Sequence, residues 1–330
     1  MGQGITETHL AVASIATAGD SGGLYRLVAR LMDEGTPLEA VLFDVLLRVE
    51  QEVGHRWQRG EYLVAEEHAV TATIETVVSL LAGSLDQPLE GSHVVVATAE
   101  GDSHSLPARA AAANLLFNGF RTNFLGANVL SSDLEEFLVD EKPDALVLSS
   151  AMASHLLGAR AGIEAAHTAG VPVLVGGRGF GEHGRWASVL GADAWASTPR
   201  DVVAVLRSWE PDPIAAEANA ARRTPELMEL IERRSEVMAR AEAEWTARAP
   251  DLDRRVVRAE LDISIRSLEA SLLVGEPAPL AEVLHWQAQA LPSHGIDQPS
   301  TIPDAIAAAL GSDLQGAATM LGFARGVAGE

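Results

Sequence analysis

The stretch HVVVATAEGDSH, residues 93–104, decides the fold. Its valine-rich beginning is typical of a strand that is buried on both faces of a parallel sheet. The small and polar residues that follow end the strand in a loop, which carries Asp102 and His104. Four more short and mostly apolar runs follow along the chain: RTNFLG (121–126), ALVLSS (145–150), VPVLVGG (171–177) and ADAWAS (192–197).

Helical stretches separate these runs. One is rich in alanine (108–118), the next begins at Ser132, and a third spans Leu156 to Ala169. Strands that alternate with helices predict a doubly wound parallel sheet with helices on both faces. The sequence therefore predicts a flavodoxin-like (Rossmann-type) α/β domain with a five-stranded parallel sheet over residues 89–209.

The segments on either side of this domain have helical periodicity. Residues 1–88 carry apolar side chains at helical spacing, and Gly35, Gly60 and Gly83 divide them into a predicted four-helix bundle. Residues 210–223 read as a linker. Residues 224–330 form a predicted all-α domain, which opens with Thr224 as the helix cap and Pro225 at the first helical position.

Composition excludes several classes of function. The 330 residues include no cysteine, which rules out disulfides, thiolate metal sites and a thioether-linked chromophore. The net charge of −22 would repel a phosphate backbone, so we expect no direct binding of nucleic acid. No apolar run is long enough to span a membrane and the N-terminus does not resemble a signal peptide, so we expect a soluble cytoplasmic protein.

The carboxyl ends of the predicted strands carry small and polar residues. Because these ends share one edge of a parallel sheet, where ligands bind, we expect the residues to line a single site. In chain order they are Asp102 and His104, then Gly126 and Asn128, then Ser149, then Gly176 and Gly177, and finally Ser197.

Asp102 and His104 are two residues apart in a predicted loop. At this spacing the carboxylate can accept a hydrogen bond from one imidazole nitrogen while the other nitrogen binds a metal. Zinc would need three or four protein ligands, whereas a metal that brings its own macrocycle needs only one. Gly176 and Gly177 leave room for a long group to pass between strand and helix. An ordinary flavodoxin-like domain, in which His104 is a simple loop residue, is the alternative interpretation.

These residues resemble the motifs of the cobalamin-binding domain family, which are Asp-x-His-x-x-Gly, Ser-x-Leu and Gly-Gly. The chain has Asp102-Ser103-His104-Ser105-Leu106-Pro107, then Ser149-Ser150-Ala151, then Gly176-Gly177. The resemblance implies that His104 is the lower axial cobalt ligand, that Asp102 is its partner, and that Ser149, Gly176 and Gly177 line the slot for the displaced dimethylbenzimidazole tail. Pro107 and Ala151 depart from the family's Gly and Leu, which places the shape of the pocket near the tail in question.

A second motif, Trp57-(x9)-Glu67-His68, lies in the predicted bundle. His68 is opposite the apolar stripe of its helix, so an ordinary solvated face is one interpretation. The spacing resembles the adenosylcobalamin-dependent photoreceptors, including light-responsive repressors of the MerR type. That resemblance implies that Trp57 packs on the adenosyl group, that Glu67 contacts it, and that His68 takes the upper axial site after light breaks the cobalt–carbon bond.

The order of the domains resembles the photocobilins, which bind biliverdin beside cobalamin. The resemblance implies a biliverdin site in the C-terminal helices, and the competing interpretation of these helices is a module for dimerisation or partner docking. Candidate residues for two propionates and an aromatic wall are Arg258, Arg266, His285, Trp286 and His294.

The resemblances together predict a light-sensing signalling protein and not an enzyme. Its cofactor would be adenosylcobalamin, with biliverdin as a second chromophore, and its partners would be copies of itself and an unidentified downstream protein. We expect no DNA-binding domain of the kind that precedes the cap in MerR-type repressors, and we therefore expect light to change the quaternary structure. Two alternatives stay open: a corrinoid methyl carrier of a methyltransferase system, and a cobalamin sensor or carrier without photochemistry.

Overall fold

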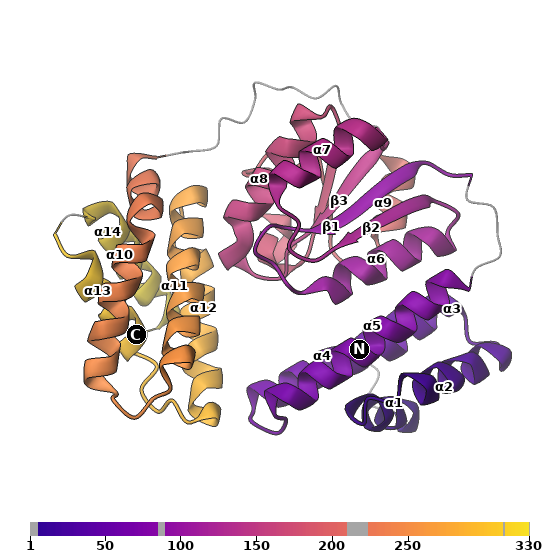
Figure 1. The fold of residues 1–330 in the computed structure, drawn as a ribbon, viewed down its shortest axis with the longest axis horizontal. Coiled ribbons are helices and arrows are strands. Elements are labelled where there is room, and N and C mark those ends of the chain that lie inside the picture. The colour runs from indigo at the N-terminus through magenta and orange to yellow at the C-terminus, as the bar shows by residue number, and fades with distance from the viewer. Residues whose placement is uncertain (1–5, 85–89, 210–223, 313, 330) are drawn as a thin grey trace.

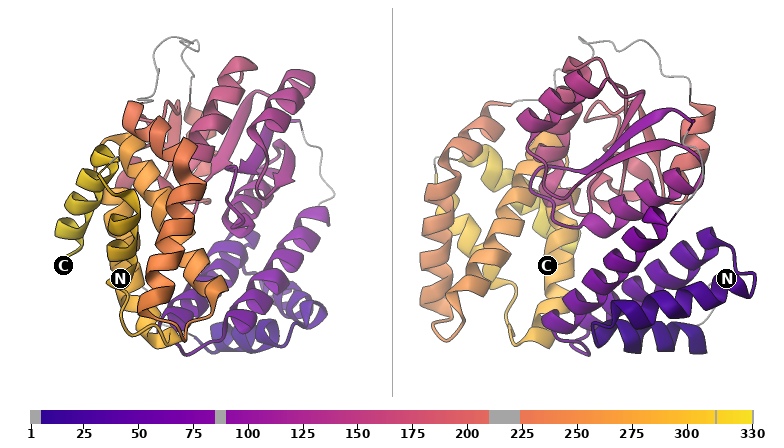
Figure 2. Two further views of the ribbon diagram at one scale, coloured as in Figure 1. Left: turned by 60° about the vertical axis from the view of Figure 1, so that its left-hand side comes forward. Right: turned by 45° about the vertical axis from the view of Figure 1, so that its right-hand side comes forward.

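The computed structural model describes residues 6–84, 90–209, 224–312 and 314–329. A central α/β layer is flanked by N-terminal helices on one side and by C-terminal helices on another (Figure 1). Two turned views show that both helical parts also approach each other (Figure 2). The predicted fold class is therefore confirmed, while the predicted linker at 210–223 lies outside the described residues.

The sheet consists of β1 (His93–Thr98), β2 (Arg121–Gly126), β3 (Ala145–Ser149), β4 (Val173–Gly176) and β5 (Ala194–Ala196). The five strands are parallel and run in the order β2-β1-β3-β4-β5. Since the chain leaves β1 towards β2 and returns to β3 on the other side, the order reverses between β1 and β3. The crevice at the carboxyl ends of these two strands is the expected place for a ligand.

Helices cover both faces of the sheet, as α6 (Ser105–Phe117), α7 (Ser131–Glu141), α8 (Leu156–Thr168) and α9 (Val202–Ser208). Alternate residues of β1 face opposite sides. Val94 and Val96 pack in one cluster with residues of α6 and α9, whereas Val95 and Ala97 pack in another with residues of α7 and α8. Short turns follow the third and fourth strands, as η2 (Ala153–His155), η3 (Arg178–Phe180) and η4 (Glu182–Gly184).

The N-terminal bundle, called the cap below, covers residues 6–84. It contains α1 (Glu7–Thr17), α2 (Ser21–Asp33), α3 (Leu38–Ala40), η1 (Val41–Leu46), α4 (Leu47–Gln58) and α5 (Val64–Gly83). The segments α3, η1 and α4 follow one another without a break, and η1 is a π-helical turn, so the cap consists of four helical rods. Its core includes Leu24, Leu42 and Ile74, and Leu106 of α6 is buried in the same cluster. The cap is thus packed on α6.

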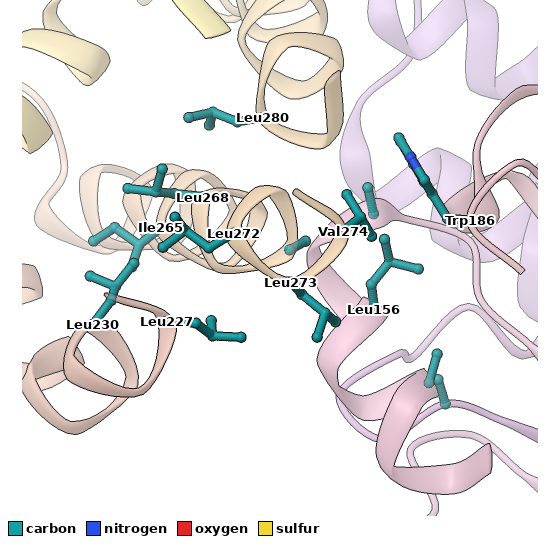
Figure 3. Packing of buried hydrophobic residues seen from close by; sticks show 14 of the residues in the cluster. Leu156, Trp186, Leu227, Leu230, Ile265, Leu268, Leu272, Leu273, Val274 and Leu280 are labelled. Carbon is teal, nitrogen blue, oxygen red and sulfur yellow. The ribbon is translucent and has the colours of Figure 1, made fainter. Parts of the chain in front are cut away.

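The C-terminal helices are α10 (Pro225–Arg248), α11 (Arg254–Val274), α12 (Ala278–Ala290), η5 (Leu291–His294), α13 (Thr301–Leu310) and α14 (Gln315–Ala328). Thr224 caps α10 as predicted, because its hydroxyl accepts a hydrogen bond from the Leu227 amide at 3.3 Å. Leu273 and Val274, at the end of α11, lie against Leu156 and Trp186 of the α/β domain (Figure 3). Among the described residues, no helix has the length and apolar character to cross a membrane.

Candidate functional site

The loop after β1 is fixed by hydrogen bonds around the backbone of Asp102. The Thr98 hydroxyl donates to the Asp102 carbonyl at 2.7 Å, and the Asn128 amide donates to the same oxygen at 3.0 Å. The Asn128 side chain in turn accepts from the Gly101 amide at 2.7 Å. Asn128 itself has a φ of 53°, a left-handed conformation that asparagine tolerates. The end of β2 therefore supports the loop that carries the predicted ligand.

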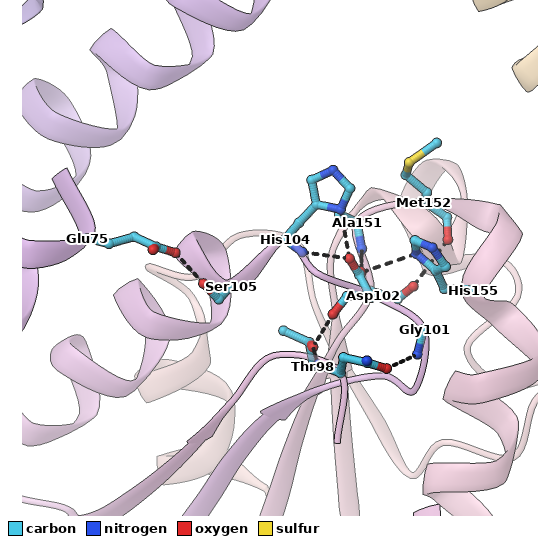
Figure 4. Close-up of polar contacts among 11 residues, drawn as sticks. Glu75, Thr98, Gly101, Asp102, His104, Ser105, Ala151, Met152 and His155 are labelled. Carbon is cyan, nitrogen blue, oxygen red and sulfur yellow. Dashed lines mark hydrogen bonds and ion pairs between the residues drawn. The ribbon is translucent and has the colours of Figure 1, made fainter. Parts of the chain in front are cut away.

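The buried Asp102 carboxylate is surrounded by donors (Figure 4). One oxygen accepts from the His104 amide at 2.9 Å and lies 2.7 Å from His104 Nδ1. The other accepts from the Ala151 amide at 2.6 Å and lies 3.6 Å from His155 Nδ1. Burial alone would raise the pKa of Asp102, but the two imidazoles and the Ala151 amide lower it well below its usual range. Asp102 is therefore ionised at neutral pH.

The His104 ring projects from this carboxylate towards the space between the α/β domain and the cap (Figure 4). Its side chain is 52% exposed, and Nδ1 faces Asp102. Because an ionised carboxylate takes the proton on Nδ1, Nε2 keeps its lone pair and is available to a metal. The Asp102 hydrogen bond also raises the pKa of His104, with smaller contributions from Glu67 and Glu50 of the cap. The predicted pairing of Asp102 with His104 is present in the structure.

His155 is a member of this site that the sequence analysis did not identify. It ends the η2 turn after β3, and its ring centroid is 6.3 Å from that of His104. Asp102, His104 and His155 bring potential metal-ligating atoms within 4.8 Å of one another. The distance of 3.6 Å from His155 Nδ1 to Asp102 is longer than a normal hydrogen bond. Its position shortly after the third predicted strand, at the same sheet edge, was the signal that could have indicated it.

Gly176, the last residue of β4, and Gly177, which follows it, both lie close to neighbouring backbone. Gly177 has a φ of 104°, and a Cβ atom there would overlap the carbonyl oxygen of Ser150. Gly176 pairs in register with Ser149 of β3. Glycine is therefore required at position 177 because the chain there passes close to Ser150, whether or not a ligand also binds nearby.

The two departures from the family motif leave the contacts of Asp102 intact. Ala151 makes its contact with Asp102 through the backbone amide, so its side chain is not needed for it. Pro107 lies in the first turn of α6, which begins at Ser105, and there its missing N–H has no intrahelical acceptor.

Several other predicted residues point elsewhere in the structure. The Ser105 hydroxyl donates to Glu75 of the cap, and Leu106 is buried in the cap core. Ser197 donates to Asp201 at 2.6 Å. Gly126 ends β2 with a φ of 93°. Ser105 and Leu106 thus join α6 to the cap, and a role for these four residues in binding a cofactor stays a prediction.

The cap residues Trp57, Glu67 and His68 lie near the turn between α4 and α5. The apolar stripe of α5 is buried as predicted, and the His68 side chain is 73% exposed with Nδ1 2.6 Å from Glu67. Burial and the neighbouring Glu67 raise the pKa of Glu50, whereas Arg178 and His104 lower it. The charges of Glu50 and Glu67 thus act on His104 from the cap.

The predicted biliverdin residues divide into two groups. Trp286 and His294 both stack on Trp57 of the cap, with ring centroids 6.0 and 5.0 Å away. The remaining three have partners of their own: Arg258 lies 4.0 Å from Glu242, Arg266 lies 2.7 Å from Asp262, and His285 contacts Gln289 at 2.8 Å.

Comparison with known proteins agrees with this geometry. Two family models, each described as a B12 binding domain, match residues 92–204 and residues 11–82. The chain is 27% identical over 166 residues to trimethylamine corrinoid protein 1 of Methanosarcina mazei, which is 48% of this chain and 76% of that protein. It is 33% identical over 153 residues to the HTH-type transcriptional repressor CarH of Myxococcus xanthus, 44% of this chain and 50% of that protein.

A solved structure supports the fold. The monomethylamine corrinoid protein of Methanosarcina barkeri superposes with a TM-score of 0.53 at 21% identity, covering 61% of this chain and 97% of that chain. At this identity the likeness shows the architecture of the α/β domain and its helical neighbour.

Proposed function

We propose that this cobalamin-binding protein is a light sensor that uses adenosylcobalamin as its chromophore and acts in signalling, not as an enzyme. The observation that carries the proposal is the placement of the Trp57, Glu67 and His68 motif on a cap that packs on α6, the helix that begins directly after His104. Similarity to the repressor CarH over half its length supports it. When bound, adenosylcobalamin supplies a cobalt–carbon bond that light breaks.

The described residues fit such a group on both sides. His104 offers one free nitrogen from below, held in a fixed tautomer by Asp102. We propose that the nucleotide tail lies beside Ser149 and Gly176, whereas the position of a side chain at Gly177 is already occupied by the Ser150 backbone. The buried indole N–H of Trp57 has no acceptor among the described residues, and we propose that it donates to the bound cofactor. Glu67 and His68 add a carboxylate and an imidazole, and we propose that His68 binds the cobalt after illumination.

The cap is held on the α/β domain by the apolar cluster that it shares with α6 and by polar contacts at the surface. Glu75 accepts from Ser105, and Arg109 donates to Ser79 at 2.8 Å. Arg200 pairs with Asp44 at 2.8 Å on the exposed surface, where an ion pair contributes little. We propose that a change at Trp57 and His68 shifts the cap, and that this shift alters self-association and contact with a downstream partner.

The first experiment compares absorption spectra and molecular size in the dark and after illumination, with adenosylcobalamin bound. We expect a spectral conversion that depends on the protein, together with a change in size. His68→Ala should give a different illuminated spectrum, because the proposed upper ligand is gone. His183→Asn is the matched control, since His183 is also exposed beside a glutamate, 3.5 Å from Glu182. An illuminated spectrum that His68→Ala leaves unchanged would contradict the ligand role of His68.

We also propose that the protein binds biliverdin as a second chromophore. Its support is the position of Trp286 and His294, two aromatic rings of the C-terminal domain that lie beside the cap. The same spectra recorded with added biliverdin test it, because a bound bilin is expected to produce a red band that is absent without the protein.

A corrinoid methyl carrier is the second candidate function, favoured by the similarity to trimethylamine corrinoid protein 1 over 76% of that protein. Such a carrier would bind methylcobalamin, require a partner methyltransferase, and tolerate the loss of Trp57. This function would be favoured if the protein binds cobalamin but does not change the response of cobalamin to light.

Cobalamin affinity should depend on pH through His104. Because Asp102 raises the pKa of His104, its protonated form stabilises the fold at low pH, and this contribution is lost as pH rises through the raised pKa. A metal needs the unprotonated nitrogen, so we expect affinity to fall by about tenfold per pH unit below that pKa and to level above it. Titrations of cobalamin between about pH 5 and 9 measure this. An affinity that is constant over the range would argue against binding through His104.

A further inference from the structure

The cap and the C-terminal domain meet at an aromatic contact. Trp57, at the end of α4, stacks on Trp286 of α12 with ring centroids 6.0 Å apart and planes inclined by 26°. It also stacks on His294 of η5 at 5.0 Å and 30°. The residue predicted to cover the upper face of the cofactor is therefore held by two rings of another domain. Each such aromatic pair stabilises the contact by more than the burial of its apolar area alone would.

The backbone beside Trp57 is packed equally closely. Gly60, in the turn after α4, has a φ of 72°, and a Cβ atom there would lie 3.0 Å from the carbonyl oxygen of Ser293. The turn between α4 and α5 therefore rests directly on η5. If this turn moves, side-chain rearrangement alone cannot accommodate the movement, because the backbones of Gly60 and Ser293 are in contact.

The C-terminal domain has a separate attachment to the α/β domain at the end of α11. Leu273 and Val274 share an apolar cluster with Leu156 and Trp186 (Figure 3). Polar contacts surround it, since Glu276 accepts from the Trp186 indole, and Arg185 pairs with Glu282 at 3.0 Å. The cap is in turn packed on α6. The three domains thus form a closed ring of contacts, so a movement of Trp57 must be taken up by one of them.

We propose that Trp286 and His294 are positioning residues for Trp57, and that the C-terminal domain thereby senses whether the cobalamin site is occupied. The proposal rests on the proposed function in one respect, namely that Trp57 lies over the bound cofactor. Linkage makes the coupling reciprocal: if cobalamin binding alters the contact with Trp286, then loss of that contact alters cobalamin affinity by the same factor.

The test is carried out in the dark on the full chain with adenosylcobalamin. In the wild type, binding should change amide hydrogen exchange in residues 286–296. Trp286→Ala should lose this change in hydrogen exchange. Its affinity for adenosylcobalamin should differ from that of the wild type by roughly two- to tenfold, the factor expected for one aromatic pair. Trp286→Phe should restore both readouts because it keeps a ring. Gln289→Ala is the matched control, an exposed residue of the same helix, one turn further on, with no ring contact to Trp57.

His294→Ala provides a second variant at an exposed position, where folding is not at stake. Exchange in α10 and α11 shows that each variant keeps its C-terminal fold. If both alanine variants bind adenosylcobalamin as the wild type does and keep its exchange response, the inference is wrong and the light-sensing proposal is untouched. If the wild type binds in the dark but has no light response, the light-sensing proposal fails while this comparison still decides the coupling.

Discussion

Replacing His104 with alanine should lower cobalamin affinity by at least about 100-fold, because loss of a supporting residue alone costs a metal site 10- to 100-fold. The absorption bands of an imidazole-bound corrinoid should disappear at the same time. His104 presents its ring to the space beside the cap, and Asp102 leaves only Nε2 available. Spectroscopic titration with cobalamin in the dark measures both the affinity and the nature of the lower ligand.

The fold should survive this substitution. Without the imidazole of residue 104, the Asp102 carboxylate still accepts from the amides of residues 104 and 151 and still faces His155. His167→Ala is the matched control, since His167 pairs with Asp193 at 2.8 Å in the same domain but on the opposite end of β4. An unchanged spectrum and affinity in the His104 variant would overturn the assignment of the lower ligand.

The sequence was sufficient to predict those features that depend on local spacing. Buried strands read as valine-rich runs, so the five strands and the edge at which they end were recognised. The pairing of Asp102 with His104 needs only a two-residue loop segment, and it is present at 2.7 Å. Helix caps are local as well, which explains why Thr224 and Pro225 marked the start of α10.

Features that depend on packing between distant segments were not predictable in this way. Sequence spacing did not reveal that the backbone of Ala151 donates to Asp102, because that contact joins two neighbouring loops. Ser105 follows the predicted ligand directly, yet it bonds to Glu75 because α6 packs on the cap. Trp57 and Trp286 were each singled out for a different ligand, and only the arrangement of the domains brings their rings together.

Replacing Arg234 with methionine should destabilise the C-terminal helices by about 3–5 kcal/mol, because it leaves a buried carboxylate without its partner. Glu269 of α11 has a side chain that is 1% exposed, and Arg234 of α10 holds it with two hydrogen bonds, of 2.6 and 2.7 Å. Burial raises the pKa of Glu269 even though Arg234 lowers it, so the ionised side chain lowers stability at neutral pH. Native-state hydrogen exchange of amides in α10 and α11 measures the change locally.

A neighbouring substitution separates this effect from the loss of any arginine. Arg233→Met removes pairs with Glu229 and Glu236, whose side chains are 47% and 41% exposed, and surface pairs of this kind contribute at most about 1 kcal/mol. The double variant Arg234→Met with Glu269→Leu should regain most of the lost stability, since an apolar pair replaces a costly ion pair. If Arg234→Met and Arg233→Met cost the same, the buried pair does not stabilise the domain. Because α11 also carries the contact with Leu156 and Trp186, a loosened α11 should weaken that contact while Asp102 and His104 keep their geometry.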